Sequence, residues 1–270
     1  MQSPELFRCV GGSIVGRDHR LVAKNNQDAW AFDAFGGITV AVVADGCGSG
    51  AHSEVGAALG VKLLLEAFRR EYRPGRAIAW SRIQQRIVSQ IDVLVAAMAG
   101  SYRQIIEEYF LFTLVGIVIE PRTATYFACG DGVIACNDTV YRLGPFPGNM
   151  PPYIGYALLA SELTIDPTTV ALAPVMTIET EQLESFMVGT DGVDDLVACE
   201  GRRLPGLQSI VGPVSDFWSD DRYFGGNPAL LSRQLKLIGR DWPQHEPEPG
   251  LLHDDTTIIV GRRSRLPEEA

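Results

Sequence analysis

The sequence predicts an α+β fold, with antiparallel sheets and helices packed outside them. Strand-like and helix-like segments come in blocks along the 270 residues and do not alternate one by one. Two pairs of β-rich segments are separated only by short turns, at residues 120–122 and at Asn137-Asp138, which is typical of antiparallel hairpins. Parallel strands would instead need a long crossover connection between them.

Most of the expected strands are short runs of apolar and β-branched residues. Residues 37–44 are almost wholly apolar and end at Asp45, as expected for a buried central strand. Further strands are expected at residues 7–15, 110–119, 123–129, 133–143 (a pair), 173–178, 186–190 and 256–260.

Helices are expected where apolar residues recur at helical spacing. One helix is expected from Ser53, a candidate N-cap, to Arg70, and another over residues 78–98. Pro74 and Gly75 separate the two. Shorter helices are expected at residues 193–199 and 228–237, whereas residues 144–167, rich in Pro, Gly and Tyr, are expected to be loop.

Composition narrows the class of protein. With 33 acidic and 23 basic residues the formal charge is −10, which disfavours nucleic acid and anionic membranes as partners. No apolar run reaches the roughly 18 residues of a membrane span, and no secretory signal is visible. The five cysteines are scattered without CxxC spacing, which argues against a zinc or disulfide framework and favours a cytoplasmic protein. Without a linker or repeat, residues 1–270 are expected to form a single domain.

Four aspartates stand at the ends of the expected strands. Asp45, Asp131 and Asp191 are each followed by glycine, and Asp254 precedes the last strand. Carboxylates on rigid strand ends are suitable ligands for Mg²⁺ or Mn²⁺. Two such ions can activate a water and neutralise phosphoryl oxygens. Because Asp-Gly is also a common turn dipeptide, each residue alone fits an Asx turn at least as well.

Short motifs in a fixed order make the chain resemble the protein phosphatase 2C family of metal-dependent Ser/Thr phosphatases, in its bacterial-type form. They run through nearly the whole chain: Asn-Gln-Asp-Ala at 26–29, Val-Ala-Asp-Gly-Cys-Gly-Ser-Gly at 43–50, His-Ser-Glu-Val-Gly-Ala at 52–57, Ala-Cys-Gly-Asp-Gly at 128–132, Gly-Thr-Asp-Gly-Val-Asp-Asp at 189–195 and Asp-Asp-Thr-Thr at 254–257.

The resemblance implies a central antiparallel β-sandwich flanked by helices, with two or three Mn²⁺ or Mg²⁺ ions at one end. It implies that Asp45 bridges two metals and that the Gly46 carbonyl binds one of them. The metal sites would be completed by Asp191 and Asp254 at the first ion, Asp28 at the second, and Asp131 and Asp195 at a looser third. Asp45 and Asp28 would hold the attacking, metal-bridged water. The substrate would be a phosphorylated protein, the product of a Ser/Thr kinase.

Three positions depart from the family pattern. Gln27 replaces a common Glu, Cys47 stands where some eukaryotic members have His, and Ala23 occupies the place of a phosphate-binding Arg. The positive charge for phosphate could come from His19, Arg20 or Lys24. The changes at Gln27 and Ala23 leave open a weak or inactive phosphatase-like binding or signalling protein. A phosphatase of small metabolites is a second alternative, because substrate contacts would lie on loops such as residues 144–167.

A Cys-x5-Arg spacing from Cys136 to Arg142 also fits thiol-based phosphatases. That chemistry needs a glycine-rich loop leading into a helix, which this segment lacks. It is expected to be an ordinary hairpin, and Cys47 an ordinary packing residue.

Overall fold

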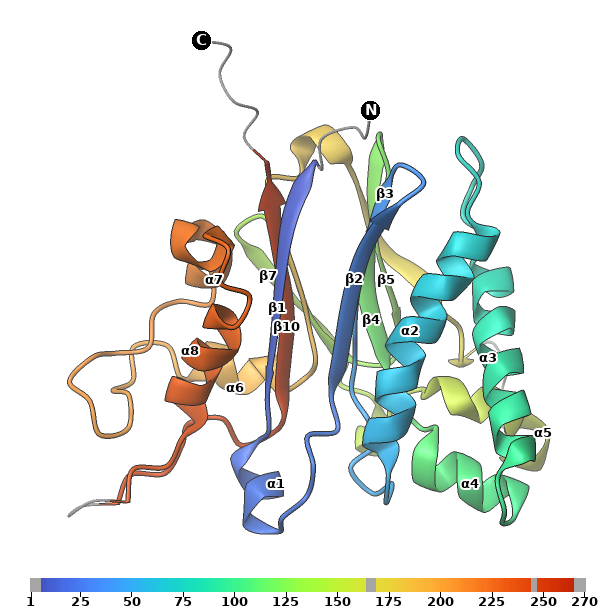
Figure 1. Ribbon diagram of the computed structural model, residues 1–270, viewed down its shortest axis with the longest axis horizontal. Coiled ribbons are helices and arrows are strands. Elements are labelled where there is room, and N and C mark those ends of the chain that lie inside the picture. Colours follow the sequence, from blue (N-terminus) through green and yellow to red (C-terminus); the bar gives the residue numbers. More distant parts are fainter. Residues whose placement is uncertain (1–5, 164–168, 244–246, 265–270) are drawn as a thin grey trace.

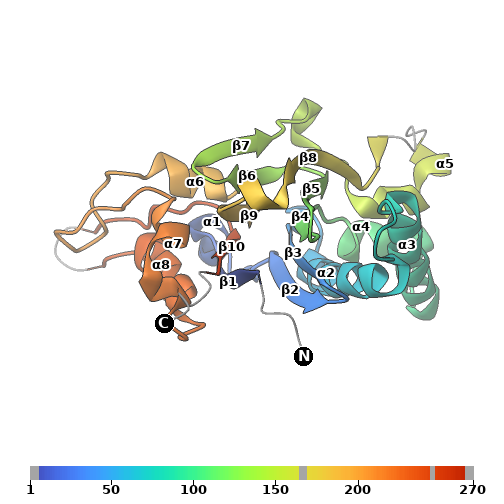
Figure 2. The same cartoon turned by 90° about the horizontal axis from the view of Figure 1, so that it is seen from above.

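The protein forms a sandwich of two antiparallel five-stranded sheets, described from a computed structural model for residues 6–163, 169–243 and 247–264. Helices cover the outer face of each sheet, so that four layers follow one another (Figure 1; Figure 2). This confirms the expected fold class. Within the described residues no helix is long and apolar enough to cross a bilayer.

The first sheet has the strand order β1-β10-β9-β6-β7. Its strands are β1 (Phe7–Ile14), β10 (Thr256–Arg263), β9 (Ser185–Gly189), β6 (Gly132–Cys136) and β7 (Thr139–Leu143). β6 and β7 form the expected hairpin, in which Asn137 adopts a positive φ of 54° that asparagine tolerates.

The second sheet has the strand order β2-β3-β4-β5-β8. Its strands are β2 (Ala29–Phe35), β3 (Ile38–Ala44), β4 (Leu114–Ile119), β5 (Thr123–Cys129) and β8 (Ala173–Glu179). β4 begins four residues later than predicted, and β2 was not predicted. The alternation of exposed and half-buried residues along β2 is that of an edge strand, and Asp33 interrupts its otherwise apolar sequence.

Side chains of β3 serve two cores because they alternate between its faces. Val40, Val42 and Ala44 pack under helices α2 (Ser53–Glu71), α3 (Trp80–Ala97) and α4 (Tyr102–Tyr109). Ala41 and Val43 pack between the sheets, against residues such as Val188 and Ile259. The almost continuous apolar run is therefore explained by burial on both faces.

The first sheet carries its own cover of short helices: α6 (Val193–Ala198), α7 (Asp216–Ser219), η5 (Asp221–Phe224) and α8 (Leu230–Gly239). The segment expected to be loop contains the short helices η1 (Pro147–Asn149), η2 (Ile154–Leu158) and α5 (Ala160–Leu163), whereas residues 164–167 lie outside the described part. Short η4 (Thr180–Gln182) precedes β9. Helix α1 (Arg17–Leu21), also unpredicted, connects β1 to the segment before β2.

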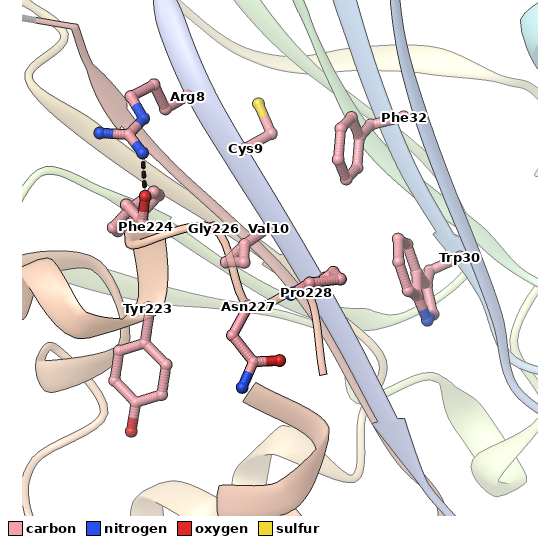
Figure 3. Close-up of a pocket in the computed structure, with 11 residues that line it drawn as sticks. Arg8, Cys9, Val10, Trp30, Phe32, Tyr223, Phe224, Gly226, Asn227 and Pro228 are labelled. Atoms are coloured by element: carbon pink, nitrogen blue, oxygen red, sulfur yellow. Dashed lines mark hydrogen bonds between the residues drawn. The ribbon is translucent and has the colours of Figure 1, made fainter. Parts of the chain in front are cut away.

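The edge strands β1 and β2 lie side by side at one open side of the sandwich (Figures 1 and 2). Trp30 and Phe32 of β2 face Cys9 and Val10 of β1 across an apolar groove (Figure 3). The rings of Trp30 and Phe32 stack with centroids 6.0 Å apart, and each of these two residues remains 37% exposed. The groove, of about 330 Å³, is closed on its third side by residues 223–228.

Candidate metal centre

The aspartates meet because the chain passes from one sheet to the other at Asp131. Strand β5 ends at Cys129 and β6 begins at Gly132 in the other sheet. The end of β3, which precedes Asp45, pairs next to the start of β4, and Gly189 at the end of β9 pairs with Val133 of β6. All these strand ends consequently lie at the same end of the sandwich, together with Asp254 before β10.

The carboxylates are close enough to raise one another's pKa. Burial raises the pKa of Asp45 well above its usual range, and the negative charges of Asp28, Asp191, Asp254 and Asp131 raise it further. The structure thus brings together five aspartates that are spread over more than two hundred residues of sequence. Such a cluster is costly unless protons or cations offset its charge.

Asp191 reports the same crowding. Its pKa is raised to about 7, first by burial and then by the charges of Asp254 and Asp131. The pKa of Asp254 is raised chiefly by burial of its carboxyl group, and that of Asp131 has the same main cause. A bound divalent cation would favour the ionised form of all three groups.

Asp28 has one satisfied and one unsatisfied oxygen. Its Oδ2 accepts a 2.7 Å hydrogen bond from the hydroxyl of Thr190. Its Oδ1 is buried and has no hydrogen-bond partner among the described residues. Burial, followed by the charge of Asp255, raises the pKa of Asp28. A buried carboxylate oxygen without a donor is what a hard cation would satisfy, so the residues present fit Mg²⁺ or Mn²⁺.

The loop that carries Asp45 is held by backbone contacts. The amide of Asp45 donates to the Thr113 hydroxyl at 3.2 Å, and the amide of Thr113 returns a 2.8 Å bond to the Asp45 carbonyl. The amide of Gly46, which is buried, donates to the carbonyl of Gln27 at 3.1 Å. These bonds fix Asp45 and Gly46 relative to the segment that carries Asp28.

Asp195, on helix α6, uses one of its carboxylate oxygens to hold the loop that carries Asp254. Its Oδ2 accepts from the amides of His253 at 2.6 Å and Asp254 at 3.2 Å. Asp191, Asp195 and Asp254 contribute to an open acidic pocket of about 450 Å³, whose other lining residues are Asp18, His19, Gly192, Asp194 and His253.

Two glycines allow these loops to approach so closely. A Cβ on Gly192 would lie 2.0 Å from the carbonyl oxygen of Asp255, and one on Gly16 would lie 2.3 Å from the carbonyl carbon of Asp254. Neither contact is possible for a side chain. The Asp-Gly pair at 191–192 therefore serves loop packing as well as turn formation.

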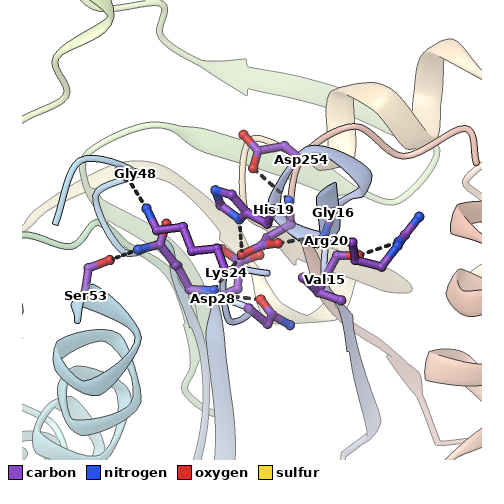
Figure 4. Close-up of polar contacts among 12 residues, drawn as sticks. Val15, Gly16, His19, Arg20, Lys24, Asp28, Gly48, Ser53 and Asp254 are labelled. Carbon is purple, nitrogen blue, oxygen red and sulfur yellow. Dashed lines mark hydrogen bonds and ion pairs between the residues drawn. The ribbon is translucent and has the colours of Figure 1, made fainter. Parts of the chain in front are cut away.

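The three candidate phosphate-binding residues have different surroundings (Figure 4). His19 lies among the carboxylates, with Nδ1 3.0 Å from Oδ2 of Asp255. Lys24 reaches the loop of residues 45–50, here called the metal loop, and donates to the carbonyl of Gly48. Arg20 points the other way: its guanidinium donates to the carbonyls of Val15 at 2.9 Å and Gly239 at 2.6 Å. Contrary to expectation, Arg20 is a structural tie between α1 and the end of α8.

The protein phosphatase 2C family model matches residues 15–235, which is most of the chain and includes all the aspartates of the cluster except Asp254. The chain belongs to the protein phosphatase 2C family. It is a metal-dependent serine/threonine phosphatase, a phosphoric monoester hydrolase whose cofactor is Mg²⁺ or Mn²⁺.

Two solved structures with TM-scores of 0.50 and 0.51 agree with this fold. A bacterial serine phosphatase is 11% identical and has a TM-score of 0.50, with 97% of this chain and 99% of that chain covered. A single-substitution variant of a bacterial serine phosphatase is 12% identical, with a TM-score of 0.51 and coverage of 96% and 99%. The serine/threonine phosphatase Stp1 of Staphylococcus aureus is 10% identical, with a TM-score of 0.49 and coverage of 98% of each chain. No curated protein matches significantly.

Two residues of the protein phosphatase 2C motifs have buried contacts at the site that the sequence analysis did not predict. Thr190, which stands for the Ser of one motif, bonds Asp28 through its hydroxyl and also accepts a 3.1 Å bond from the amide of Thr257. Asp255, which stands for the Asn of the last motif, is only 2% exposed. Both lie next to a predicted ligand in sequence, and this adjacency was the available signal.

Gln27, which replaces a common Glu in this protein phosphatase 2C sequence, is also fully buried. Its Nε2 donates to the hydroxyl of Ser53 and to the carbonyl of Gly50 at 3.3 Å. Ser53 is therefore not the N-cap of α2, since the cap position is His52 and Ser53 Oγ donates to the Cys47 carbonyl at 3.0 Å. Gln27 joins the Asp28 segment to the metal loop.

The thiols have surroundings unlike those of a thiol-based phosphatase. Burial raises the pKa of Cys136, which is the opposite of the shift that activates a nucleophilic thiol. Arg142 is also occupied, by a 2.6 Å contact with Asp194. Cys47 is 9% exposed and packs in the core between the second sheet and helices α2, α3 and α4, as expected for a packing residue.

Proposed function

We propose that this phosphatase holds its divalent cations with Asp28, Asp45, Asp191, Asp254 and the Gly46 carbonyl, with Asp131 and Asp195 beside them. The carboxylates of Asp45 and Asp28 would both lie at the centre of this cation site, since the buried Oδ1 of Asp28, which has no donor, is part of the same cluster. Bound cations would supply an activated water and neutralise phosphoryl oxygens. The protein's part is to hold carboxylate oxygens on rigid strand ends.

The gathering of four other aspartates around Asp45 is the observation that supports this proposal. A non-catalytic family member would have no need to keep so many mutually repelling carboxylates. Bound cations would offset this repulsion while the carboxylates stay ionised, which favours the enzyme over a binding protein.

For the phosphoryl group we propose His19 and Lys24 as the cationic contacts. Lys24 lies against the loop that follows Asp45, and His19 lies in the acidic pocket beside Asp254. Both are carried by the short segment between β1 and β2, so they would approach a substrate from the same side. The departure at Ala23 would thus be compensated by its neighbours.

We also propose that the whole chain, residues 1–270, works as one phosphatase domain in the cytoplasm, in signalling. Its substrate would be a protein phosphorylated by a Ser/Thr kinase, and not nucleic acid or a membrane component. The net charge of −10 supports this choice because polyanionic surfaces would be repelled.

A phosphatase assay titrated with Mn²⁺ and Mg²⁺ tests the proposal, with p-nitrophenyl phosphate, Ser/Thr phosphopeptides and small phosphorylated metabolites as substrates. We expect hydrolysis that requires the cation and stops with a chelator, and a higher kcat/KM for phosphopeptides than for metabolites. Lack of hydrolysis with cation affinity retained would favour a binding protein, and a preference for metabolites would overturn the protein substrate.

A further inference from the structure

Asp255 is a buried carboxylate at which three parts of the site meet. Its Oδ1 accepts a 2.7 Å hydrogen bond from the amide of Gly16. Its Oδ2 accepts a 2.6 Å bond from the amide of Gln27 and lies 3.0 Å from Nδ1 of His19. With 2% exposure, it is shielded from bulk solvent.

All three neighbours of this carboxylate are donors or can be. A carboxylate, which only accepts, satisfies them with two oxygens. An asparagine of the same shape has one oxygen, so its NH₂ group would face the N–H of either Gly16 or Gln27. One buried amide would then be left without an acceptor. The structure thus explains why an aspartate suits this chain at a position where the family motif has Asn.

The contacts of Asp255 connect the chain segments that carry the proposed ligands. Gly16 begins the turn into α1 and His19, Gln27 directly precedes Asp28, and Asp255 itself follows Asp254. The amide of Asp255 also donates to Oδ1 of Asp254 at 2.7 Å, which orients that side chain. One buried group therefore sets the relative positions of Asp28, Asp254 and His19.

We propose that Asp255 is a positioning residue that pre-forms the cation site without binding the cation itself. This inference rests on the proposed function. Single ligand atoms of His19, Asp254 and Asp255 lie within 4.8 Å of one another, a separation that a cation could bridge. Both Asp255 oxygens, however, are already occupied by buried backbone amides, whereas Oδ1 of Asp28 has no donor.

The test compares Mn²⁺ affinity of metal-free wild type and Asp255→Asn by titration calorimetry, at a temperature where circular dichroism shows both to be folded. We expect the variant to bind Mn²⁺ about 10- to 100-fold more weakly, the usual effect of losing a group that orients metal ligands. In activity assays the Mn²⁺ concentration for half-maximal rate should rise by a similar factor.

Two control variants separate positioning from charge and from stability. Asp18→Asn removes the same charge from a residue that lines the same pocket but is 62% exposed. Ile87→Val trims a fully buried side chain of α3, under the other sheet, and lowers Tm without touching the site. Both should bind Mn²⁺ as wild type does.

Wild-type Mn²⁺ affinity in folded Asp255→Asn would overturn the inference while leaving the proposed function intact, and so would equal weakening in Asp18→Asn or Ile87→Val. Wild type that neither binds Mn²⁺ nor hydrolyses phosphomonoesters would instead overturn the proposed function. Hydrogen exchange adds a measurement that needs no variant. In the metal-free wild type, the amides of Gly16 and Gln27 should already be protected, and exchange at loop rates would contradict a pre-formed site.

Discussion

The hydroxyl of Thr190 donates a 2.7 Å hydrogen bond to Oδ2 of Asp28, although 162 positions separate the two residues in the chain. Thr190 directly follows strand β9 of one sheet, and Asp28 precedes the edge strand β2 of the other. The bond therefore connects the two sheets at the end of the sandwich where the aspartates gather. It also lowers the pKa of Asp28, against the larger effect of burial.

Thr190→Val tests this tie. The variant keeps the shape but leaves the Asp28 oxygen and the amide of Thr257 without the hydroxyl, so the free energy of unfolding should fall by about 1–3 kcal/mol. Mn²⁺ affinity should fall as well. Thr190→Ser, which keeps the hydroxyl, is the matched control. Urea denaturation and calorimetry measure both effects, and equal stability of the two variants would contradict the role of the bond.

Removal of a central carboxylate should separate activity from folding. Asp45→Asn or Asp191→Asn should lower hydrolysis of p-nitrophenyl phosphate by about 100-fold or more. In chelator the Tm should equal or exceed that of wild type, because one member of a mutually repelling cluster is neutralised. Asp33→Asn, which breaks a surface pair with Arg69, serves as control. Near-wild-type hydrolysis by either cluster variant would refute the assigned ligands.

The metal-free protein should lose stability as pH rises. The folded-state pKa of Asp191 is about 7, against an ordinary value of 3.8, so between these values the folded state binds more protons than the unfolded chain. The contribution of Asp191 therefore falls from about pH 4 to about pH 7 and is constant above. Scanning fluorimetry in chelator should give a lower Tm at about pH 7.5 than at about pH 5.

Added Mn²⁺ should reverse this trend, because cations and protons compete for the same carboxylates. The fall in chelator should be smaller in Asp191→Asn, which lacks one of the titrating groups. A Tm of metal-free wild type that rises over this pH range, or the same fall in the variant, would show that the cluster does not govern the pH dependence.

Close loop packing makes Gly192 sensitive to any side chain. In Gly192→Ala the new Cβ would meet the carbonyl oxygen of Asp255 at 2.0 Å, so the loops must separate, at a cost of about 1–3 kcal/mol. Gly48→Ala is the control, since a Cβ there has nothing within 4 Å. Urea denaturation should show a loss for the first variant alone, and comparable midpoints would contradict the packing described.

The phosphate contacts can be distinguished by inhibition with inorganic phosphate. His19→Ala should raise the inhibition constant about tenfold or more, the effect of losing one charge-assisted hydrogen bond. Arg20→Met should leave that constant unchanged and instead lower stability, because the carbonyls of Val15 and Gly239 lose their donor. The opposite pattern would return the phosphate role to Arg20.

The sequence alone determined the class of fold and the identity of the acidic residues, because the signals for both lie in short, continuous segments of the chain. Apolar runs predicted β3 and β5, helical periodicity predicted α2 and α3, and strand-end aspartates marked the candidate ligands. The edge strand β2 escaped prediction because its exposed positions also carry apolar residues, so that its alternating burial leaves no alternation of polar and apolar residues in the sequence.

Only the tertiary structure decided which distant groups serve one another. It brought the carboxylate of Asp255 under the amides of Gly16 and Gln27, left Oδ1 of Asp28 without a donor, and turned Arg20 away from the cluster. These relationships depend on how the two sheets are stacked and where the chain crosses between them. Hydrogen bonds between segments hundreds of residues apart leave no periodic trace in the sequence, since each partner alone is compatible with many surroundings.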